Sequence, residues 1–297
     1  MQWFNKAPYV YRPAQVLRRM GRCLCPPSSA VVNATLPWGM PITIDPRETI
    51  GRTIWHAGVH DLDVCEALYR LADPDEVALD IGANIGQMTC VLALRVGGAG
   101  RVLAFEPHPV VFQRLSANLA RWRNQPGVAT LEAFPWAVSD APGEVSLIES
   151  ADFAHNQGTA TLGASGINSA KEHRVRAATL AEICRDIERV GVVKMDVEGH
   201  EVRVLHGGAE LLRQHRIRSV IFEDDLAAGS KTVAVFQQYG YEVFVLEWRF
   251  GGVRLHPVRE WRPTLAHGTV PSCVATCDPQ DTLRRFATTG WQVLAHR

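Results

Sequence analysis

The sequence predicts an α/β fold in which a doubly wound, mostly parallel sheet carries helices on both faces. Short apolar runs alternate with segments of helical periodicity from about residue 60 onward. Strands that alternate with helices along a chain usually pair in parallel, because each helix returns the chain across the sheet. Four of the apolar runs end on an acid: Asp80, Glu106, Asp196 and Glu223. Ligands of such sheets bind at the carboxyl ends of the strands, so these acids are candidate site residues.

The composition is that of a globular protein. Hydrophobic residues make up 46% of the 297 and charged residues 21%, which is enough apolar material to form a core. Basic and acidic residues number 31 each, so the net charge of zero offers no general attraction for nucleic acid. With no run of 18 apolar residues and no apolar leader segment, we expect no membrane span and a cytoplasmic protein.

Apolar runs bounded by turn residues predict the strands. Residues 77–80 are a short apolar run closed by an acid, and residues 190–195 are a second run of this kind. A hairpin over 145–149 and 160–162 is expected as an insertion after the third strand of the alternating part. The expected strands of the main sheet, with a short one near the N-terminus, are 42–44, 77–80, 101–105, 128–134, 190–195, 219–222, 241–246 and 270–276.

Helical spacing of apolar residues predicts the connecting helices. Leu62, Cys65 and Leu68 share one face of the first. Gly240 stands where a glycine commonly ends a helix. The expected helices are 61–71, 87–95, 110–121, 179–187, 201–214 and 231–239.

The chain divides into three parts on this interpretation. Residues 1–44 form an N-terminal arm with a short strand, residues 45–276 form the α/β domain, and residues 277–297 form a C-terminal tail. The arm combines aromatic and basic residues, among them Trp3 and Tyr9. Such an arm is suited to contacts with a second copy of the chain, so a homodimer is a possible assembly.

The first chemical motif connects the strand at 77–80 to the next helix. It reads Asp80-Ile-Gly82-Ala-Asn84-Ile-Gly86, in which glycines allow a tight turn and a close approach of ligand or helix. It is neither GxGxxG nor a phosphate-binding loop with Lys-Ser/Thr. Glu106 follows Gly86 by 106 − 86 = 20 positions, the spacing of an acid that binds ribose hydroxyls. Two carboxylates near a nucleoside suit a cationic ligand such as S-adenosylmethionine and repel a pyrophosphate.

The second motif follows the strand at 190–195. Asp196, Glu198, His200 and Glu201 cluster acids and an imidazole at a strand end. A buried carboxylate there is costly unless it is paired or functional. For Glu201, a role at the positive N-terminal end of the following helix is an equally good interpretation.

The residues at these motifs resemble the FkbM family of S-adenosylmethionine-dependent methyltransferases. The resemblance covers roughly residues 45–275, and the order and spacing of its pieces are more specific than any single piece. The pieces are LDIGANIGQMT at 79–89, FEPHP at 105–109, AVSD at 137–140, NQGTATL at 156–162, VVKMDVEGHEVRVLHGG at 192–208 and FED at 222–224.

The resemblance implies a class I, Rossmann-like methyltransferase fold and a cofactor site. Asp80 and Gly82 would line the methionine moiety, Glu106 would bind both ribose hydroxyls, and Pro107 would shape the adenine pocket. Asp196 would face the transferring methyl group. The cofactor-binding positions that it implies are Asp61, Asp80, Gly82, Asn84, Gly86, Glu106, Pro107, Ser139, Asp140 and Asp196.

The implied reaction is O-methylation of a hydroxyl on a small-molecule natural product or a sugar or glycan. A hydroxyl is a poor nucleophile and needs a base, for which Asp196, Glu198 and His200 are the candidates. The acceptor site would be bordered by three residues: His155, Asn156 and Glu223.

Three alternatives remain beside this interpretation. The acids Asp196, Glu198, Glu223 and Asp224 have the oxygen ligands that Mg²⁺ or Ca²⁺ prefers, although metal-free catalysis is favoured and no metal ligands are assigned. An NAD-dependent oxidoreductase is less favoured, because GxGxxG is absent. A non-catalytic protein that binds a cofactor or a partner would use the same fold.

Overall fold

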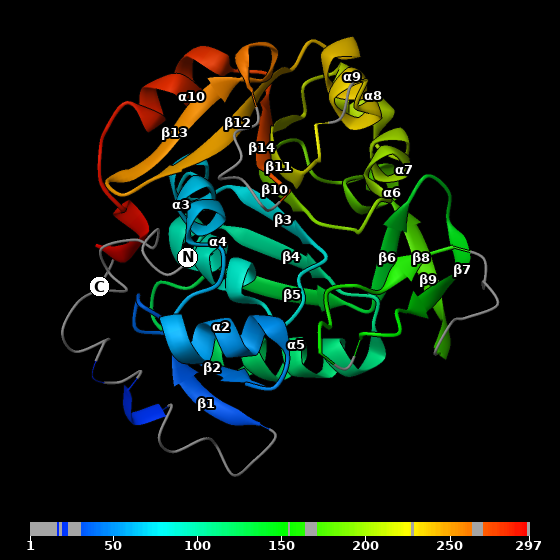
Figure 1. The fold of residues 1–297 in the computed structure, drawn as a ribbon. Helices are drawn as coiled ribbons and strands as arrows, with labels where there is room; N and C mark the ends of the chain where they lie inside the picture. Colours follow the sequence, from blue (N-terminus) through cyan, green and yellow to red (C-terminus); the bar gives the residue numbers. More distant parts are fainter. Residues whose placement is uncertain are drawn as a thin grey trace.

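The computed structural model describes residues 17, 20–22, 31–153, 155–163, 171–226, 229–262 and 270–295. Its centre is an eight-stranded sheet in the order β13-β12-β14-β11-β10-β3-β4-β5 (Figure 1). The strands are β3 (Val77–Ile81), β4 (Arg101–Phe105), β5 (Thr130–Phe134), β10 (Val190–Met195), β11 (Ile217–Glu223), β12 (Glu242–Arg249), β13 (Gly252–Pro257) and β14 (Ser272–Thr276).

Five strands, from β11 to β5, pair in parallel, and β14, β12 and β13 add an antiparallel edge. The chain proceeds from β3 outward through β4 and β5, then returns to form β10 and β11 on the other side of β3. The boundary between β3 and β10 is therefore the switch point of the sheet, where crossovers leave in opposite directions and a ligand crevice forms. The expected α/β class and its mostly parallel pairing are confirmed.

Helices cover both faces of this sheet because neighbouring strand residues point to opposite sides. On β3, Ala78 belongs to the core beneath α3 and α4, whereas Leu79 belongs to the core on the face of α7 and α9. The helices are α2 (Thr49–Ala57), α3 (Leu62–Leu71), α4 (Gln87–Val96), α5 (Pro109–Trp122), α6 (Leu180–Ile183), α7 (Glu201–His206), α8 (Ala209–Arg213), α9 (Lys231–Gln238) and α10 (Pro279–Phe286).

A second sheet lies beside the carboxyl ends of the parallel strands, in green in Figure 1. It has the order β6-β9-β7-β8 and consists of β6 (Trp136–Ser139), β7 (Gly143–Glu149), β8 (Thr161–Leu162) and β9 (Lys171–Thr179). The expected hairpin is its β7–β8 pair, and β6 and β9 extend it. Ala137, Leu147 and Val175 form its own small core.

The expected N-terminal arm is attached to the main core where the structure describes it. The hairpin of β1 (Val32–Thr35) and β2 (Pro41–Ile44) packs against α5. The indole of Trp122 donates to the carbonyl of Pro41 at 2.6 Å, and Asn118 exchanges two hydrogen bonds with the backbone of Thr43. The expected dimer contact rests on aromatic residues that lie outside the described residues: Trp3, Phe4, Tyr9 and Tyr11.

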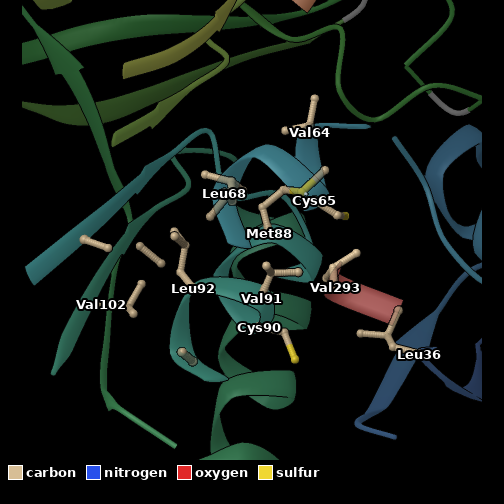
Figure 2. Close-up of a cluster of buried hydrophobic side chains, with 14 of the residues drawn as sticks. Leu36, Val64, Cys65, Leu68, Met88, Cys90, Val91, Leu92, Val102 and Val293 are labelled. Carbon is tan, nitrogen blue, oxygen red and sulfur yellow. Dashed lines mark hydrogen bonds between the residues drawn. The ribbon is translucent and has the colours of Figure 1, made fainter. Parts of the chain in front are cut away.

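The expected C-terminal tail is also part of the core. Figure 2 shows Val293, from the short 3-10 helix η4 (Gln292–Leu294), in one cluster with side chains of α3 and α4 and with Leu36. The buried carboxylate of Glu66 on α3 accepts hydrogen bonds from the backbone N–H groups of Gln292 and Val293. Residues 277–295 therefore contribute to the main core through Phe286 and Val293.

Several further elements differ from expectation. The helix expected over 201–214 is divided into α7 and α8 at Gly207 and Gly208, where a Cβ on Gly207 would lie 2.1 Å from the carbonyl oxygen of Ser139. The elements that were not expected are α2, α10, β1, β6, β9 and β13. In the part of the chain described, no helix is long and apolar enough to cross a membrane.

Candidate functional site

A cleft opens at the switch point of the main sheet. Its walls come from the carboxyl ends of β3, β4, β10 and β11, from β6 of the second sheet, and from the start of α3. It is open to solvent, and its lining combines apolar side chains with a few convergent polar groups, as ligand sites commonly do. Sequence-predicted site residues that line it are Asp61, Gly82, Asn84, Glu106, Pro107, Asp196, Glu198 and Glu223.

The floor of the cleft is the turn after β3. The backbone of this turn contacts Phe105 of β4 on one side and Asp196, which follows β10, on the other. The N–H groups of Gly82 and Ala83 both donate to the carbonyl of Phe105 at 2.9 Å. Gly82 has φ +74°, and a Cβ there would lie 1.9 Å from the carbonyl oxygen of Asp196. Position 82 therefore requires glycine for two reasons: its φ is positive, and any side chain would clash with the backbone of Asp196.

Glu106 projects from the end of β4 into the cleft. One carboxylate oxygen accepts the N–H of Asn84 at 3.0 Å, and the other accepts the N–H of His108 at 2.9 Å. Burial raises the pKa of Glu106 to about 7. Asn84 itself has φ +49°, an αL conformation that asparagine tolerates and that aims its N–H at Glu106.

Lys194 is a central residue that the sequence analysis missed. Its ammonium donates to the carbonyl of Gly82 at 2.7 Å and lies 3.2 Å from Asp196 and 3.8 Å from Asp80. Burial opposes its charge, but Asp196 and Asp80 outweigh burial and raise the pKa of Lys194. A lysine inside the otherwise apolar β10 is the signal that could have identified it, because a buried lysine is rare unless it is paired.

Asp80 does not line the cleft. Its side chain is fully buried beneath the turn, where one oxygen accepts the hydroxyl of Thr89 at 2.5 Å and the other faces Lys194. Burial raises the pKa of Asp80. The resemblance implied a direct contact with the methionine moiety, whereas the structure points this carboxylate inward, so that it acts on the cleft through Lys194.

Gly86 also lies behind the cleft. It has φ +94°, and a Cβ there would lie 2.8 Å from Leu115 and 3.3 Å from Trp122 of α5. It allows α4 and α5 to pack closely, which is the role of a packing glycine rather than of a ligand contact.

Acidic side chains gather around Asp196 at the mouth of the cleft. Asp61 directly precedes α3, has φ +41° and lies 2.9 Å from the ring of His60, which also lines the cleft. Desolvation by the cleft walls, reinforced by Asp196 and Asp61, raises the pKa of Glu223 to about 7. Burial, with Asp196 and Glu201 nearby, raises the pKa of Glu198.

Ser139, Asp140 and His200 form a separate polar group outside the cleft lining. The hydroxyl of Ser139 lies 2.8 Å from Nε2 of His200 and 3.0 Å from Asp140. Burial and the nearby Arg203 lower the pKa of His200. The corresponding wall of the cleft is apolar instead and comprises Phe105, Trp136, Ala137, Val138, Leu147 and Leu162.

His155 and Asn156 do not line the cleft either, although the next two residues, Gln157 and Gly158, do. The His155 side chain is 76% exposed beside Asp152, while its carbonyl accepts the N–H of Thr49 at 2.9 Å. The Asn156 side chain accepts the N–H of Gly158 at 3.2 Å and so shapes its own turn. Gln157 and Gly158 of the same segment reach the cleft.

Asp224, a member of the alternative cation group, faces away from the other acids. Its two carboxylate oxygens accept the N–H of Leu226 at 2.7 Å and the hydroxyl of Ser230 at 2.6 Å. It shapes the turn after β11, so the four acids proposed for a divalent cation are not brought together as one group.

The chain is similar in sequence to known methyltransferases. The chain is 33% identical over 171 residues to the hexuronic acid methyltransferase AglP of Haloferax volcanii, covering 58% of this chain and 65% of that protein. It is 30% identical over 221 residues to the 31-O-demethyl-FK506 methyltransferase FkbM of Streptomyces tacrolimicus, covering 62% of this chain and 80% of that protein. The chain thus spans about two thirds of one relative and four fifths of the other.

Among solved structures, the methyltransferase FkbM from Methylobacillus flagellatus KT aligns at a TM-score of 0.44 with 16% identity, over 69% of this chain and 44% of that one. The family model of the methyltransferase FkbM domain matches residues 80–243, from Asp80 within β3 to the start of β12. The chain belongs to the FkbM methyltransferase family.

Proposed function

We propose that this chain is an S-adenosylmethionine-dependent O-methyltransferase that acts on a hydroxyl of a sugar, a glycan or a small-molecule natural product. The observation that carries the proposal is that Gly82 and Glu106 line the same cleft at the carboxyl ends of the strands. The turn at Gly82 has no room for a side chain, and the Glu106 carboxylate is oriented by two backbone N–H groups.

The residues of the cleft match the parts of this cofactor. Glu106 would accept hydrogen bonds from the ribose hydroxyls, and the apolar wall with Phe105 and Trp136 would hold the adenine. The backbone at Gly82 and Asn84 would hold the methionine end. Asp196 and its acidic neighbours would favour a sulfonium, and they would repel the pyrophosphate of a dinucleotide such as NAD.

When bound, the cofactor supplies a methyl carbon that is electrophilic because it is attached to positively charged sulfur. The remaining task is to hold the acceptor hydroxyl and remove its proton. Asp196 and Glu223 end adjacent strands and both line the cleft. With a pKa of about 7, Glu223 is suited to accept a proton near neutral pH.

Glu198 is a third carboxylate that could serve as the base, because it also lines the cleft. His200 is poorly placed to act as the base. Its Nε2 is engaged with Ser139, and its side chain stands outside the lining.

The charge of the cleft favours a neutral or cationic acceptor over an anionic one. Asp61, Asp196, Glu198 and Glu223 line its open side, and Lys194 is held between Asp80, Asp196 and the carbonyl of Gly82. An acceptor carboxylate would be repelled by these acids. We therefore expect neutral sugars to be better acceptors than the hexuronic acid named for the relative AglP.

The test is product formation with a panel of neutral, amino and uronic sugars and polyol natural products, followed by mass spectrometry of the acceptor. Asp196→Asn should lower turnover roughly 100-fold or more while S-adenosylhomocysteine affinity stays within about twofold. Glu144→Gln, at an exposed position outside the cleft, is the matched control. Unchanged turnover in Asp196→Asn would remove Asp196 from the reaction, and cofactor binding without any product would favour a non-catalytic binding protein.

A further inference from the structure

A second polar cluster lies next to the cleft, behind Glu106. It consists of His108, Glu149 and His173, which come from three different elements. His108 precedes α5, Glu149 ends β7, and His173 lies on β9. In the pairing of β7 with β9, Glu149 is opposite Lys171 and Leu147 is opposite His173. Glu149 and His173 are therefore diagonal neighbours, and residues two apart along a strand share one face.

Both histidines point a ring nitrogen at the same carboxylate oxygen. Nε2 of His173 lies 2.7 Å and Nε2 of His108 lies 3.1 Å from Oε1 of Glu149, and the ammonium of Lys171 lies 3.7 Å from it. Three groups thus converge on one oxygen. In the part of the chain that the structure describes, this is the one group of three or more His, Cys, Asp or Glu side chains with ligand atoms this close together.

The rings of this cluster are held in place before any ligand binds. His108 is 1% exposed and stacks on Phe153 with a centroid distance of 4.3 Å. Its ring also meets the edge of the His173 ring at 4.8 Å. Such packing lowers the ordering cost of binding, because the side chains have little rotamer freedom left to lose.

Two imidazoles and one carboxylate are a donor set of zinc sites that keep one position for water. With zinc–nitrogen bonds of about 2.0–2.1 Å, ligand atoms of a tetrahedral site lie about 3.4 Å apart. The two nitrogen–oxygen distances, 2.7 and 3.1 Å, are shorter than this value because the groups are hydrogen-bonded to one another, and all three ligand atoms lie within 4.8 Å of one another.

We propose that His108, Glu149 and His173 bind a zinc ion, with Lys171 displaced from the carboxylate when the ion enters. The ion would join the second sheet to the segment after β4. The backbone N–H of His108 donates to Glu106 at 2.9 Å, so the ion would also stiffen the carboxylate assigned to the ribose. The zinc-site proposal does not depend on the methyl-transfer proposal, because its test measures zinc binding alone.

The test is zinc titration of the full chain after treatment with a chelator, with metal content measured by mass spectrometry and affinity by competition with a chromophoric chelator. Wild type should bind one zinc ion per chain. His173→Ala should lower this affinity at least about tenfold. His256→Ala is the matched control, because His256 pairs with a single carboxylate, Glu247, at 2.6 Å and has no second histidine there.

Lys171→Met is a second variant, and we expect it to raise zinc affinity rather than lower it. It removes the competing ammonium, so zinc affinity should rise, and no ligand or packed ring is lost. Circular dichroism checks that each variant is folded. Equal zinc affinity in wild type and folded His173→Ala, or an equal loss in His256→Ala, would overturn the site. A lack of any increase in Lys171→Met would overturn the displacement of that ammonium.

Discussion

Single residues determine what the cleft can hold, and Gly82 shows this most directly. Its positive φ and the carbonyl of Asp196 next to it leave no room for a methyl group. A turn motif and a spacing in the sequence predict this glycine together with Glu106. The directions of the side chains do not follow from these patterns. Asp80 turns inward beneath the turn and faces the buried Lys194, which itself reaches the cleft. A turn motif carries no information about the contacts beneath the turn.

Gly82→Ala tests the close approach at the turn. The added Cβ would force Gly82 and Asp196 apart, in addition to the roughly 1–2 kcal/mol that a left-handed conformation costs a residue with a side chain. Gly39→Ala is the matched control, since Gly39 has φ +91° and no neighbouring atom within 4 Å of a built Cβ. In urea denaturation Gly82→Ala should lose more stability than Gly39→Ala, and it alone should lose cofactor affinity. Equal losses in the two variants would show that the contact with Asp196 does not matter.

The raised pKa of Glu106 predicts a pH-dependent affinity for cofactor. Ribose hydroxyls donate to the ionised carboxylate more strongly than to the neutral acid. Because burial raises the pKa of Glu106 to about 7, S-adenosylhomocysteine affinity should increase as the pH rises through about 7. Calorimetry across this range checks it, and Glu106→Gln should show a flatter profile. The same profile in both proteins would mean that another group titrates.

The effect of Glu106 on stability has the opposite sign. Its pKa in the folded chain lies above the ordinary value of 4.5, so the folded state holds the proton more tightly than the unfolded state. The resulting stability is fully present below about 4.5 and is lost as the pH rises through about 7. Cofactor affinity and the stability contribution of Glu106 therefore change in opposite directions over this window.

At the scale of elements, the bounds of the apolar strands could be predicted accurately from the sequence, whereas polar strands could not be predicted. β3, β4 and β10 are short buried runs, and their predicted bounds agree with the structure to within one residue. β9 is rich in charged residues at its start, and only its pairing with β7 and β6 holds it in a sheet. The helix expected over 201–214 is broken by two glycines, of which Gly208 packs against Leu180. Such tertiary contacts are invisible to local periodicity.

α10 gives a prediction at this scale, because the sequence analysis treated its residues as a tail. Phe286 is 7% exposed and belongs to the main core, whereas Leu283 of the same helix is 46% exposed. Phe286→Ala should lower the free energy of unfolding by about 3–5 kcal/mol. Leu283→Ala should change it by less than about 0.5 kcal/mol. Thermal and urea unfolding of the two variants compares them, and equal small effects would restore the idea of a loosely attached tail.

For the whole molecule, the fold class and the position of the cleft follow from the order of strands and helices. The cleft forms where the first half of the sheet, ending in Gly82 and Glu106, meets the second half, ending in Asp196 and Glu223. The second sheet supplies the apolar wall with Trp136, and this wall could not be predicted because it depends on how the two sheets are placed against each other. The packing of residues 277–295 depends likewise on contacts with α3 that are distant in sequence.

Calorimetric titration of the purified chain with S-adenosylmethionine, S-adenosylhomocysteine and NAD tests the central claim most directly. We expect micromolar binding of the two sulfur compounds and no binding of NAD, because the cleft offers a ribose-binding carboxylate and an acidic mouth. Glu106→Ala should abolish most of that affinity. Failure of the wild-type chain to bind S-adenosylhomocysteine, or wild-type affinity in Glu106→Ala, would contradict the assignment of this cleft to the cofactor.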